Sequence, residues 1–473
     1  MVEGHSIDYI PKAERHGKAW HQATLWFAGN ANLSTLVIGL LGITLGLTLF
    51  WDLAAVTLGL AFGTLFMASH SVQGPRMGIP QMIQSRPQFG YYGALLPQTV
   101  GIFLYVGFNV FNTILAGQAL AALTPLSSGE GIVVSFLLAL VIAYGGYDWL
   151  HRFQRWFTYV FLVCFGVFTV GVLFTVKLPQ AQSGVGSFHL TAFLIVLLAS
   201  ASYVISEAPY VSDYSRYLEP RTTSRSCFLW TYAGSGIGAL WVIALGAFLL
   251  AAFPGAQTAD VILKGGDSIF SGFGTISLIV AFVMMVPVIS MNMYGGSLTA
   301  ITVIDSVRDI KLGKRIRLIT ILFIGVLATG LSLTLPQNFL TDYGNFLTIL
   351  LYFLVPWSAI NLMDFYVVRR GDYAITEIFK RHGIYGLWQW RGLVAYAIGF
   401  LVMIPFFATP IFTGPIAKAF DNADISIFVG LPVSALAYYL LARNADREDE
   451  RLLARTNEPE IMSVPLDADK APV

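Results

Sequence analysis

Charged residues are scarce in this chain. Of its 473 residues, 12% are Asp, Glu, Lys or Arg and 56% are hydrophobic, whereas a soluble domain carries about 25% charged residues. So few charges cannot cover the surface of a water-soluble protein of this length. The shortage indicates a chain whose surroundings are mostly lipid.

Cysteine is almost absent, and the start of the chain lacks an apolar leader. Cys164 and Cys227 lie in or beside apolar runs, and they form neither a disulfide framework nor the spacing of a metal site. The first 22 residues are polar and basic, without the apolar core of a secretory signal. We find no phosphate-binding glycine loop, nucleophile elbow or pair of catalytic carboxylates. We therefore expect no enzyme, no cofactor, no metal site and no binding of nucleic acid.

Long apolar runs are what the sequence has instead. A run of about 20 residues can cross a membrane as a helix, and twelve such runs predict an all-α integral membrane protein with twelve transmembrane helices. The predicted spans cover residues 23–45, 48–70, 92–122, 131–147, 157–177, 189–211, 228–253, 272–302, 317–335, 340–363, 393–412 and 424–442.

The basic residues alternate in step with these spans. The alternate loops together hold only Lys177, Lys264 and Lys418, and the other 25 of the 28 basic residues lie on the opposite side. Because cytoplasmic loops are enriched in Lys and Arg, we expect a multi-pass plasma-membrane protein with both termini cytoplasmic. The cytoplasmic parts include an N-terminal segment, 1–22, and a charged tail, 443–473. The simplest role of loop arginines such as Arg369 is to set this topology.

The first and sixth predicted spans contain residues that break helices. Gly29, Asn30 and Asn32 are weak helix formers, and Pro209, which lacks an amide donor, follows Glu207 in the sixth span. Irregular backbone at membrane depth is tolerated where it lines a protein cavity. Two such breaks five spans apart indicate a transporter made of inverted repeats, with its site near the middle of the membrane. Chance placement of polar residues is the alternative.

Six stretches carry a family resemblance. They read "IDYIPKAERHGKAWHQATLWFAGNAN", "GPRMGIPQMIQSRPQFG", "FNTILAGQAL", "EAPYVSDYSRYL", "MNMYGGSLTAI" and "FLTILLYFLVPWSAINLMDFYVVRRGDY". The chain resembles the first nucleobase–cation symport family, and within it the purine–cytosine permease branch. The resemblance implies a five-plus-five inverted repeat of the LeuT type (residues 23–177 and 189–363) followed by two additional helices (393–442). It also implies cation-coupled uptake of a nucleobase, such as cytosine or a purine, by alternating access.

A nucleobase is flat and uncharged, so its site needs an aromatic face and amide or hydroxyl groups for its edges. The broken spans and their partners offer such groups. Tyr203 lies about where the family has a stacking aromatic, and it is the predicted stacking residue. For these positions, ordinary packing, helix–helix hydrogen bonds and capping of helix ends are the alternatives. The predicted substrate-binding residues are Phe27, Asn30, Asn32, Phe108, Asn109, Asn112, Ser202, Tyr203, Ser206, Asn292 and Ser297.

The coupling ion is predicted from the eighth and sixth spans. The resemblance implies that sodium-coupled relatives use a Ser-Thr-Asn pattern where this chain has Ser290-Met291-Asn292, and a thioether is a poor ligand for a hard cation. Ala28, Asn32 and Ser290 remain a possible cation site. Glu207 is a carboxylate near mid-membrane, where ionisation is costly and a functional role is the default reading. The family has an uncharged residue near this position, so Glu207 is a departure from it. We predict proton coupling at Glu207 in preference to sodium, with a structural carboxylate as the alternative.

Other transporter classes remain open at this point. The ligand could be another small heterocycle, such as allantoin, hydantoin or a pyrimidine vitamin precursor, or an amino acid. Amino-acid carriers usually have a glycine-rich first break, whereas "GNAN" at residues 29–32 suits an uncharged ligand better. A channel or a membrane sensor is a further alternative, although no loop is long enough for a soluble output domain. The sequence does not indicate which nucleobase is carried or how many chains assemble.

Overall fold

Helices form most of the described chain. The structure, a computed structural model, describes residues 8–145, 147–308, 314–335 and 338–456, and it has no strand within these ranges apart from two isolated bridges. The prediction of an all-α protein is therefore confirmed. Residues 1–7 of the expected N-terminal segment and residues 457–473 of the expected tail lie outside the described residues.

The long helices follow the predicted spans in order along the chain. They are α1 (Trp20–Gly29), α2 (Leu33–Thr44), α3 (Leu49–Ser71), α6 (Leu95–Leu123), α7 (Ser128–Tyr144), α8 (Tyr147–Thr175), α9 (Leu190–Ile205), α10 (Ala208–Ser215), α11 (Ser224–Ala252), α13 (Phe273–Val307), α14 (Lys314–Thr334), α15 (Phe339–Met363), α17 (Trp390–Met403) and α19 (Ser426–Ala442).

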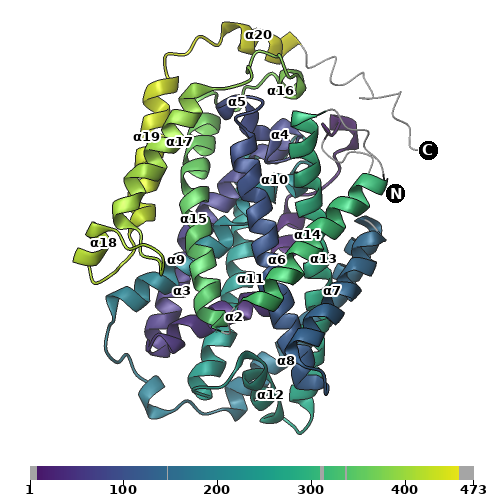
Figure 1. Ribbon diagram of the computed structural model, residues 1–473, viewed down its shortest axis with the longest axis vertical. Helices are drawn as coiled ribbons and strands as arrows, with labels where there is room; N and C mark the ends of the chain where they lie inside the picture. Colours follow the sequence, from purple (N-terminus) through teal and green to yellow (C-terminus); the bar gives the residue numbers. More distant parts are fainter. Residues whose placement is uncertain (1–7, 146, 309–313, 336–337, 457–473) are drawn as a thin grey trace.

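Shorter helices lie between and after them. These are α4 (Gln73–Met77), α5 (Arg86–Phe89), α12 (Thr258–Asp267), α16 (Ile375–Phe379), α18 (Pro415–Ala419) and α20 (Glu448–Thr456), and a π-helical turn, Asp364–Val368, continues α15. In Figure 1, α5, α16 and α20 lie at one end of the long axis and α12 lies at the other.

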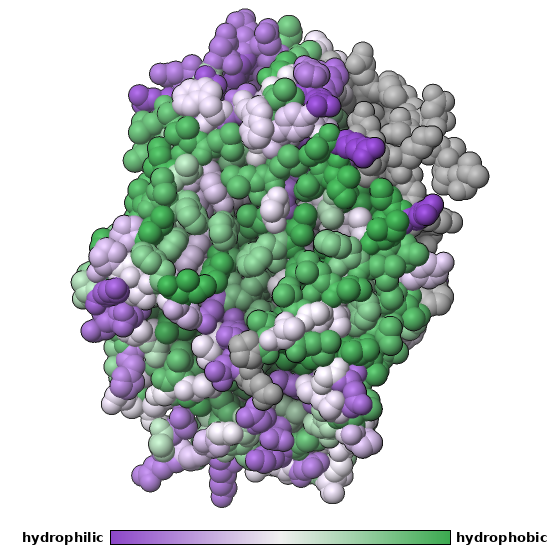
Figure 2. All heavy atoms as spheres, in the orientation of Figure 1, coloured by the Kyte–Doolittle hydropathy of each residue, from purple (hydrophilic) through white to green (hydrophobic). Residues whose placement is uncertain are grey.

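The apolar helices are those of a multi-pass membrane protein. Among the described residues, eight helical segments are long and apolar enough to span a membrane, and the bent pair α1–α2 makes a ninth. Three shorter apolar helical segments, Ser128–Tyr144, Trp390–Phe406 and Ser426–Ala442, correspond to the fourth, eleventh and twelfth predicted spans. Figure 2 shows a hydrophobic band around the middle of the visible face, with hydrophilic residues gathered toward both ends.

Some predicted boundaries were wrong. Helix α8 begins at Tyr147, and its membrane-spanning segment begins at Arg152 and not at residue 157, because residues such as Arg152 and Arg155 are good helix formers and continue the helix beyond its apolar part. The eleventh ends at Phe406 and not at residue 412, since the prolines beyond Met403 lack amide donors. The short helix α12 lies in what was expected to be a plain loop.

The first break is where the sequence predicted it. Helix α1 ends at Gly29, α2 begins at Leu33, and the two axes differ by 65°. Asn32 adopts an extended conformation, and its side-chain Oδ1 accepts a hydrogen bond from the Thr35 amide at 3.1 Å. Asparagine is among the best residues for this N-cap position. The polar residues therefore end one helix and start the next.

The sixth span is also interrupted, but without a sharp bend. Helix α9 ends at Ile205 and α10 begins at Ala208, so Ser206 and Glu207 form the break. Pro209 lies in the first turn of α10, where its missing amide costs no hydrogen bond. The two segments still continue as one apolar span, Leu190–Ser215. The predicted break is confirmed, and its shape differs from that of the first.

Helices α3, α9 and α10 are packed as one block. A Cβ atom added at Gly63 of α3 would lie 2.5 Å from the Ala201 carbonyl oxygen of α9, so the backbones are in close contact. Further along, Ser212 and Ser215 of α10 donate hydrogen bonds to the carbonyl oxygens of His70 and Ser71, at 3.1 and 2.6 Å. The second broken span is therefore packed against α3 before its break and hydrogen-bonded to α3 after it.

Helix α2 crosses α11 at a point that admits only glycine. A Cβ atom at Gly39 would lie 1.9 Å from the Ile243 carbonyl oxygen, and one at Gly246 would lie 2.1 Å from that of Leu36. We expect Gly39→Ala to lower the free energy of unfolding by about 1 kcal/mol or more, because overpacking a tight contact forces the backbones apart. The control is Gly166→Ala in α8, where a Cβ atom has no neighbour within 4 Å. Unfolding of the purified variants in detergent measures the stability of both. Equal stability of Gly39→Ala and Gly166→Ala would contradict the prediction.

A buried ionic cluster closes the end of the molecule that holds α20. The Arg369 guanidinium pairs with Asp364 and, at 2.7 Å, with Glu450 of α20. Burial and the charge of Glu450 raise the pKa of Tyr385 well above its ordinary value, so the Tyr385 hydroxyl stays protonated and donates to Glu450 at 2.8 Å. We call this set the Arg369 cluster; it consists of Arg369, Asp364, Glu450, Gln88, Tyr373, Tyr385 and Tyr438.

Candidate functional site

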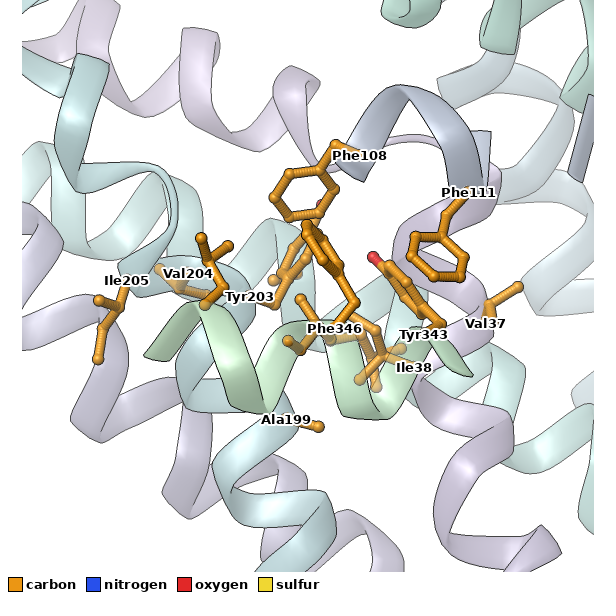
Figure 3. Packing of buried hydrophobic residues seen from close by; sticks show 14 of the residues in the cluster. Val37, Ile38, Phe108, Phe111, Ala199, Tyr203, Val204, Ile205, Tyr343 and Phe346 are labelled. Atoms are coloured by element: carbon orange, nitrogen blue, oxygen red, sulfur yellow. The ribbon is translucent and has the colours of Figure 1, made fainter. Parts of the chain in front are cut away.

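Two predicted aromatic residues meet in the interior. Phe108 of α6 and Tyr203 of α9 are both buried and lie edge to face, with ring centroids 6.3 Å apart. Figure 3 shows Phe108 directed toward Tyr203 and Phe346, with Phe111 beside Tyr343. The five rings come from α6, α9 and α15. We call Phe108, Phe111, Tyr203, Tyr343 and Phe346 the aromatic cluster.

Tyr203 is tied to the first break. Its hydroxyl and the Thr35 hydroxyl are 2.6 Å apart, and Thr35 in turn donates from its backbone amide to Asn32 Oδ1. The Asn32 side-chain amide donates to the Gly29 carbonyl at 2.8 Å. The predicted residues Asn32 and Tyr203 are thus joined through Thr35, and the N-cap of α2 positions the aromatic ring.

Helix α6 brings two buried amides beside Phe108 in the sequence. Asn109 and Asn112 are 1% and 2% exposed, and neither side-chain Oδ1 atom has a hydrogen-bond partner among the described residues. A buried acceptor without a partner costs about 1–3 kcal/mol. Such atoms suit the N–H groups on the edge of a bound heterocycle.

The two serines of the sixth span that were predicted to bind substrate, Ser202 and Ser206, bond to backbone. Ser202 donates to the Leu347 carbonyl of α15, and Ser206 donates to the Tyr203 carbonyl within the break. Both side chains are buried. These bonds hold α9 against α15 and stabilise the end of α9, so the hydroxyl protons are already engaged.

Glu207 faces α11. It is 6% exposed, and its Oε2 atom accepts a hydrogen bond from Ser235 of α11 at 3.1 Å. The Ser235 hydroxyl is also 3.5 Å from the side-chain nitrogen of Asn30, at the end of α1. The residues predicted at the two breaks, Asn30 and Glu207, are therefore connected through a third helix.

Other predicted residues lie apart from these contacts. Phe27 stacks on Trp241 of α11, with centroids 5.7 Å apart. Ser297 pairs with Thr320 of α14 at 2.6 Å, and Asn292 is half-buried on α13. Among the described residues, no hydrogen bond or ring–ring contact joins these three to the aromatic cluster.

The possible cation site is not assembled by direct contacts. The Ser290 hydroxyl lies 2.8 Å from the Ala139 carbonyl of α7 and 2.9 Å from the Val286 carbonyl. The Ala28 carbonyl accepts the Ala31 amide at 3.1 Å, and the Asn32 carbonyl accepts the Leu36 amide at 3.4 Å. A sodium ion at these three residues stays a prediction. No group of three His, Cys, Asp or Glu residues that could hold a metal occurs in the part of the chain that the structure describes.

The sequence reasoning missed several residues around the site. Thr35 lies three positions after the N-cap residue Asn32, and that spacing was a usable signal. Tyr343 and Phe346 are three positions apart, which places them on one face of α15. Ser235 gave no signal, because one serine in an apolar helix is common. Tyr105, Tyr210 and Trp26 form a second group of rings that joins α6, α10 and α1.

Comparison with known proteins adds a family and a fold. A family model described as permeases for cytosine/purines, uracil, thiamine and allantoin matches residues 9–430. The putative purine-cytosine permease YxlA of Bacillus subtilis is 36% identical over 445 residues, which cover 93% of this chain and 96% of that protein. The purine-cytosine permease fcyB of Emericella nidulans is 26% identical, over 93% of this chain and 88% of that protein.

Solved structures share the arrangement of helices. The inward-facing conformation of Mhp1 superimposes with a TM-score of 0.76 at 16% identity, covering 98% of each chain. A closed conformation of Mhp1, a nucleobase-cation-symport-1 family transporter with bromovinylhydantoin bound, gives a TM-score of 0.74 at 16% identity, over 97% of this chain and 99% of that one. At this identity the likeness establishes the fold alone.

Proposed function

This chain belongs to the family of permeases for cytosine/purines, uracil, thiamine and allantoin, and we propose that it imports a nucleobase such as cytosine or a purine. It is a multi-pass membrane transporter and not an enzyme. The proposal includes a plasma-membrane location with both termini cytoplasmic. It also includes alternating access through two inverted repeats, residues 23–177 and 189–363, with the additional helices at 393–442.

Two observations carry the substrate class: a buried aromatic pair, and two buried amides without partners on the helix that holds Phe108. Phe108 and Tyr203 offer ring faces, and the Oδ1 atoms of Asn109 and Asn112 are buried acceptors without partners. Stacking a base on an aromatic side chain contributes about 1–3 kcal/mol. An uncharged ring with N–H groups on its edge satisfies both kinds of group. A related heterocycle such as allantoin or hydantoin fits the same chemistry and is the second candidate.

The coupling ion proposed is a proton, and its carrier is Glu207. The carboxylate is buried at the second break and has no ion-pair partner among the described residues. Ionising such a group within the membrane is costly unless it is paired, so proton binding relieves that cost. Sodium at Ala28, Asn32 and Ser290 is less favoured, because the Ser290 hydroxyl is directed to carbonyls of α7 and its own helix.

Uptake into proteoliposomes tests both parts of the proposal. Labelled cytosine, adenine, hypoxanthine, allantoin and hydantoin are offered under a proton gradient without sodium, and then under a sodium gradient at equal pH. We expect concentrative uptake of a nucleobase under the proton gradient, and loss of that accumulation in Glu207→Gln. Uptake driven by sodium alone, with Glu207→Gln unaffected, would overturn proton coupling. Accumulation of none of these compounds would overturn the substrate class.

A further inference from the structure

A chain of three hydrogen-bonding side chains links the two broken spans. Ser235 of α11 donates to Glu207 Oε2 at 3.1 Å, and the Asn30 side-chain nitrogen donates to Ser235 Oγ at 3.5 Å. The same Asn30 nitrogen donates to the Trp26 carbonyl at 2.8 Å, in the last turn of α1. Asn30 and Ser235 are fully buried, and Asn30 Oδ1 has no partner among the described residues.

The direction of this chain depends on the proton state of Glu207. An ionised carboxylate only accepts, so the Ser235 hydroxyl donates to it and is left to accept from Asn30. A carboxyl protonated on Oε2 becomes a donor, and two protons cannot lie between the same two oxygens. The Ser235 proton then needs another acceptor.

Asn30 Oδ1 is that acceptor. It belongs to the amide already beside Ser235, and rotating this side-chain amide by half a revolution brings Oδ1 to the place of Nδ2. The rotation gives the unpartnered oxygen a donor. It also removes Nδ2 from the Trp26 carbonyl, and that bond stabilises the end of α1. Protonation at the second break thereby changes the bonding at the first.

We infer that Ser235 is a positioning residue that transmits the protonation of Glu207 to Asn30 and to the end of α1. The inference rests on the proposed proton coupling. The titratable groups that interact electrostatically with Glu207 are Tyr203 and Tyr210, both of its own span. No Lys, Arg or His from the helices packed against its span, which include α2, α3, α4 and α15, or from α11, which carries Ser235, pairs with Glu207 in the described parts of the chain. Ser235 is therefore the only polar side chain bonded to this carboxylate there.

Proton uptake on ligand binding is the test that separates this role from a structural one. Purified protein in weakly buffered detergent solution is mixed with cytosine, or with whichever compound the uptake panel identifies, and a pH indicator reports protons taken up. The ligand affinity is measured in parallel between pH 5.5 and 8. One linked proton changes the affinity by about tenfold per pH unit at most. The variants are Ser235→Ala, Ser235→Thr, Asn30→Ala and Glu207→Gln, and a melting curve for each establishes that it is folded.

In Ser235→Ala and Asn30→Ala, we expect the change in ligand affinity per pH unit to be at least tenfold smaller than in the wild-type protein. We also expect ligand binding to these variants to take up no proton. Ser235→Thr keeps a hydroxyl and should retain both the pH dependence of ligand affinity and the proton uptake. A purely packing role for Ser235 would not predict this difference between alanine and threonine. Wild-type proton uptake in Ser235→Ala or, if that variant does not fold, in Asn30→Ala overturns the relay and leaves Glu207 as the coupling group. Absence of proton uptake in the wild-type protein overturns proton coupling itself, together with the relay.

Discussion

Replacing Arg369 with glutamine is expected to lower the free energy of unfolding by about 3–5 kcal/mol. The substitution leaves Asp364, which is fully buried, and Glu450, which is 7% exposed, without their shared cation. Removing one partner of a buried ion pair strands a charge that cannot be hydrated. The melting temperature of the purified protein, together with its denaturant midpoint, measures the loss.

The neighbouring arginine provides a matched control. Arg370 is exposed, so Arg370→Gln makes the same chemical change without stranding a carboxylate, and surface charges contribute little. We expect it to unfold like the wild-type protein. Similar stability of the two variants would show that the Arg369 cluster is not a buried ion-pair network.

Tyr203→Ala is expected to weaken ligand binding by up to about 3 kcal/mol, roughly 100-fold, because the stacking face is lost. Tyr203→Phe keeps the ring and loses only the hydroxyl bond to Thr35, which is worth about 1 kcal/mol. Equilibrium binding of the transported heterocycle checks this. We expect the affinity to decrease in the order wild type, Tyr203→Phe, Tyr203→Ala. The control is Tyr159→Ala on α8, where the side chain is 56% exposed. Unchanged affinity in Tyr203→Ala would place the ligand elsewhere.

The broken spans could be predicted because their causes are local. Gly29, Asn30 and Asn32 end one helix and cap the next, and Pro209 fits only at the start of α10. The contact between Phe108 and Tyr203 was not predicted. Both were predicted substrate-binding residues, but they lie on separate helices, and the resemblance placed only Tyr203 near a break. The 65° bend of the first break, against the nearly continuous sixth span, depends on packing and had no signal in the sequence.

What the sequence could not indicate depends on contacts between distant segments. Arg369 was interpreted as a topological residue, because a basic residue after an apolar run is usual at the cytoplasmic side. Its partners Asp364 and Glu450 are 5 and 81 positions away, and Glu450 lies in a tail that reads only as charged. Ser235 was missed for the same reason, since its role appears only when α11 is placed between Asn30 and Glu207.

The hydrogen bonds that the serines of α10 donate to α3 indicate which helices keep a constant distance from one another during transport. Ser212 and Ser215 bond α10, the second half of the sixth span, to the end of α3, and Gly63 brings α9, the first half, into close contact with the same helix. We therefore expect α3, α9 and α10 to move together if the carrier rocks. Probes attached across α3 and α10 then keep a constant separation through every step. Movement has to be sought between this unit and α6 or α13.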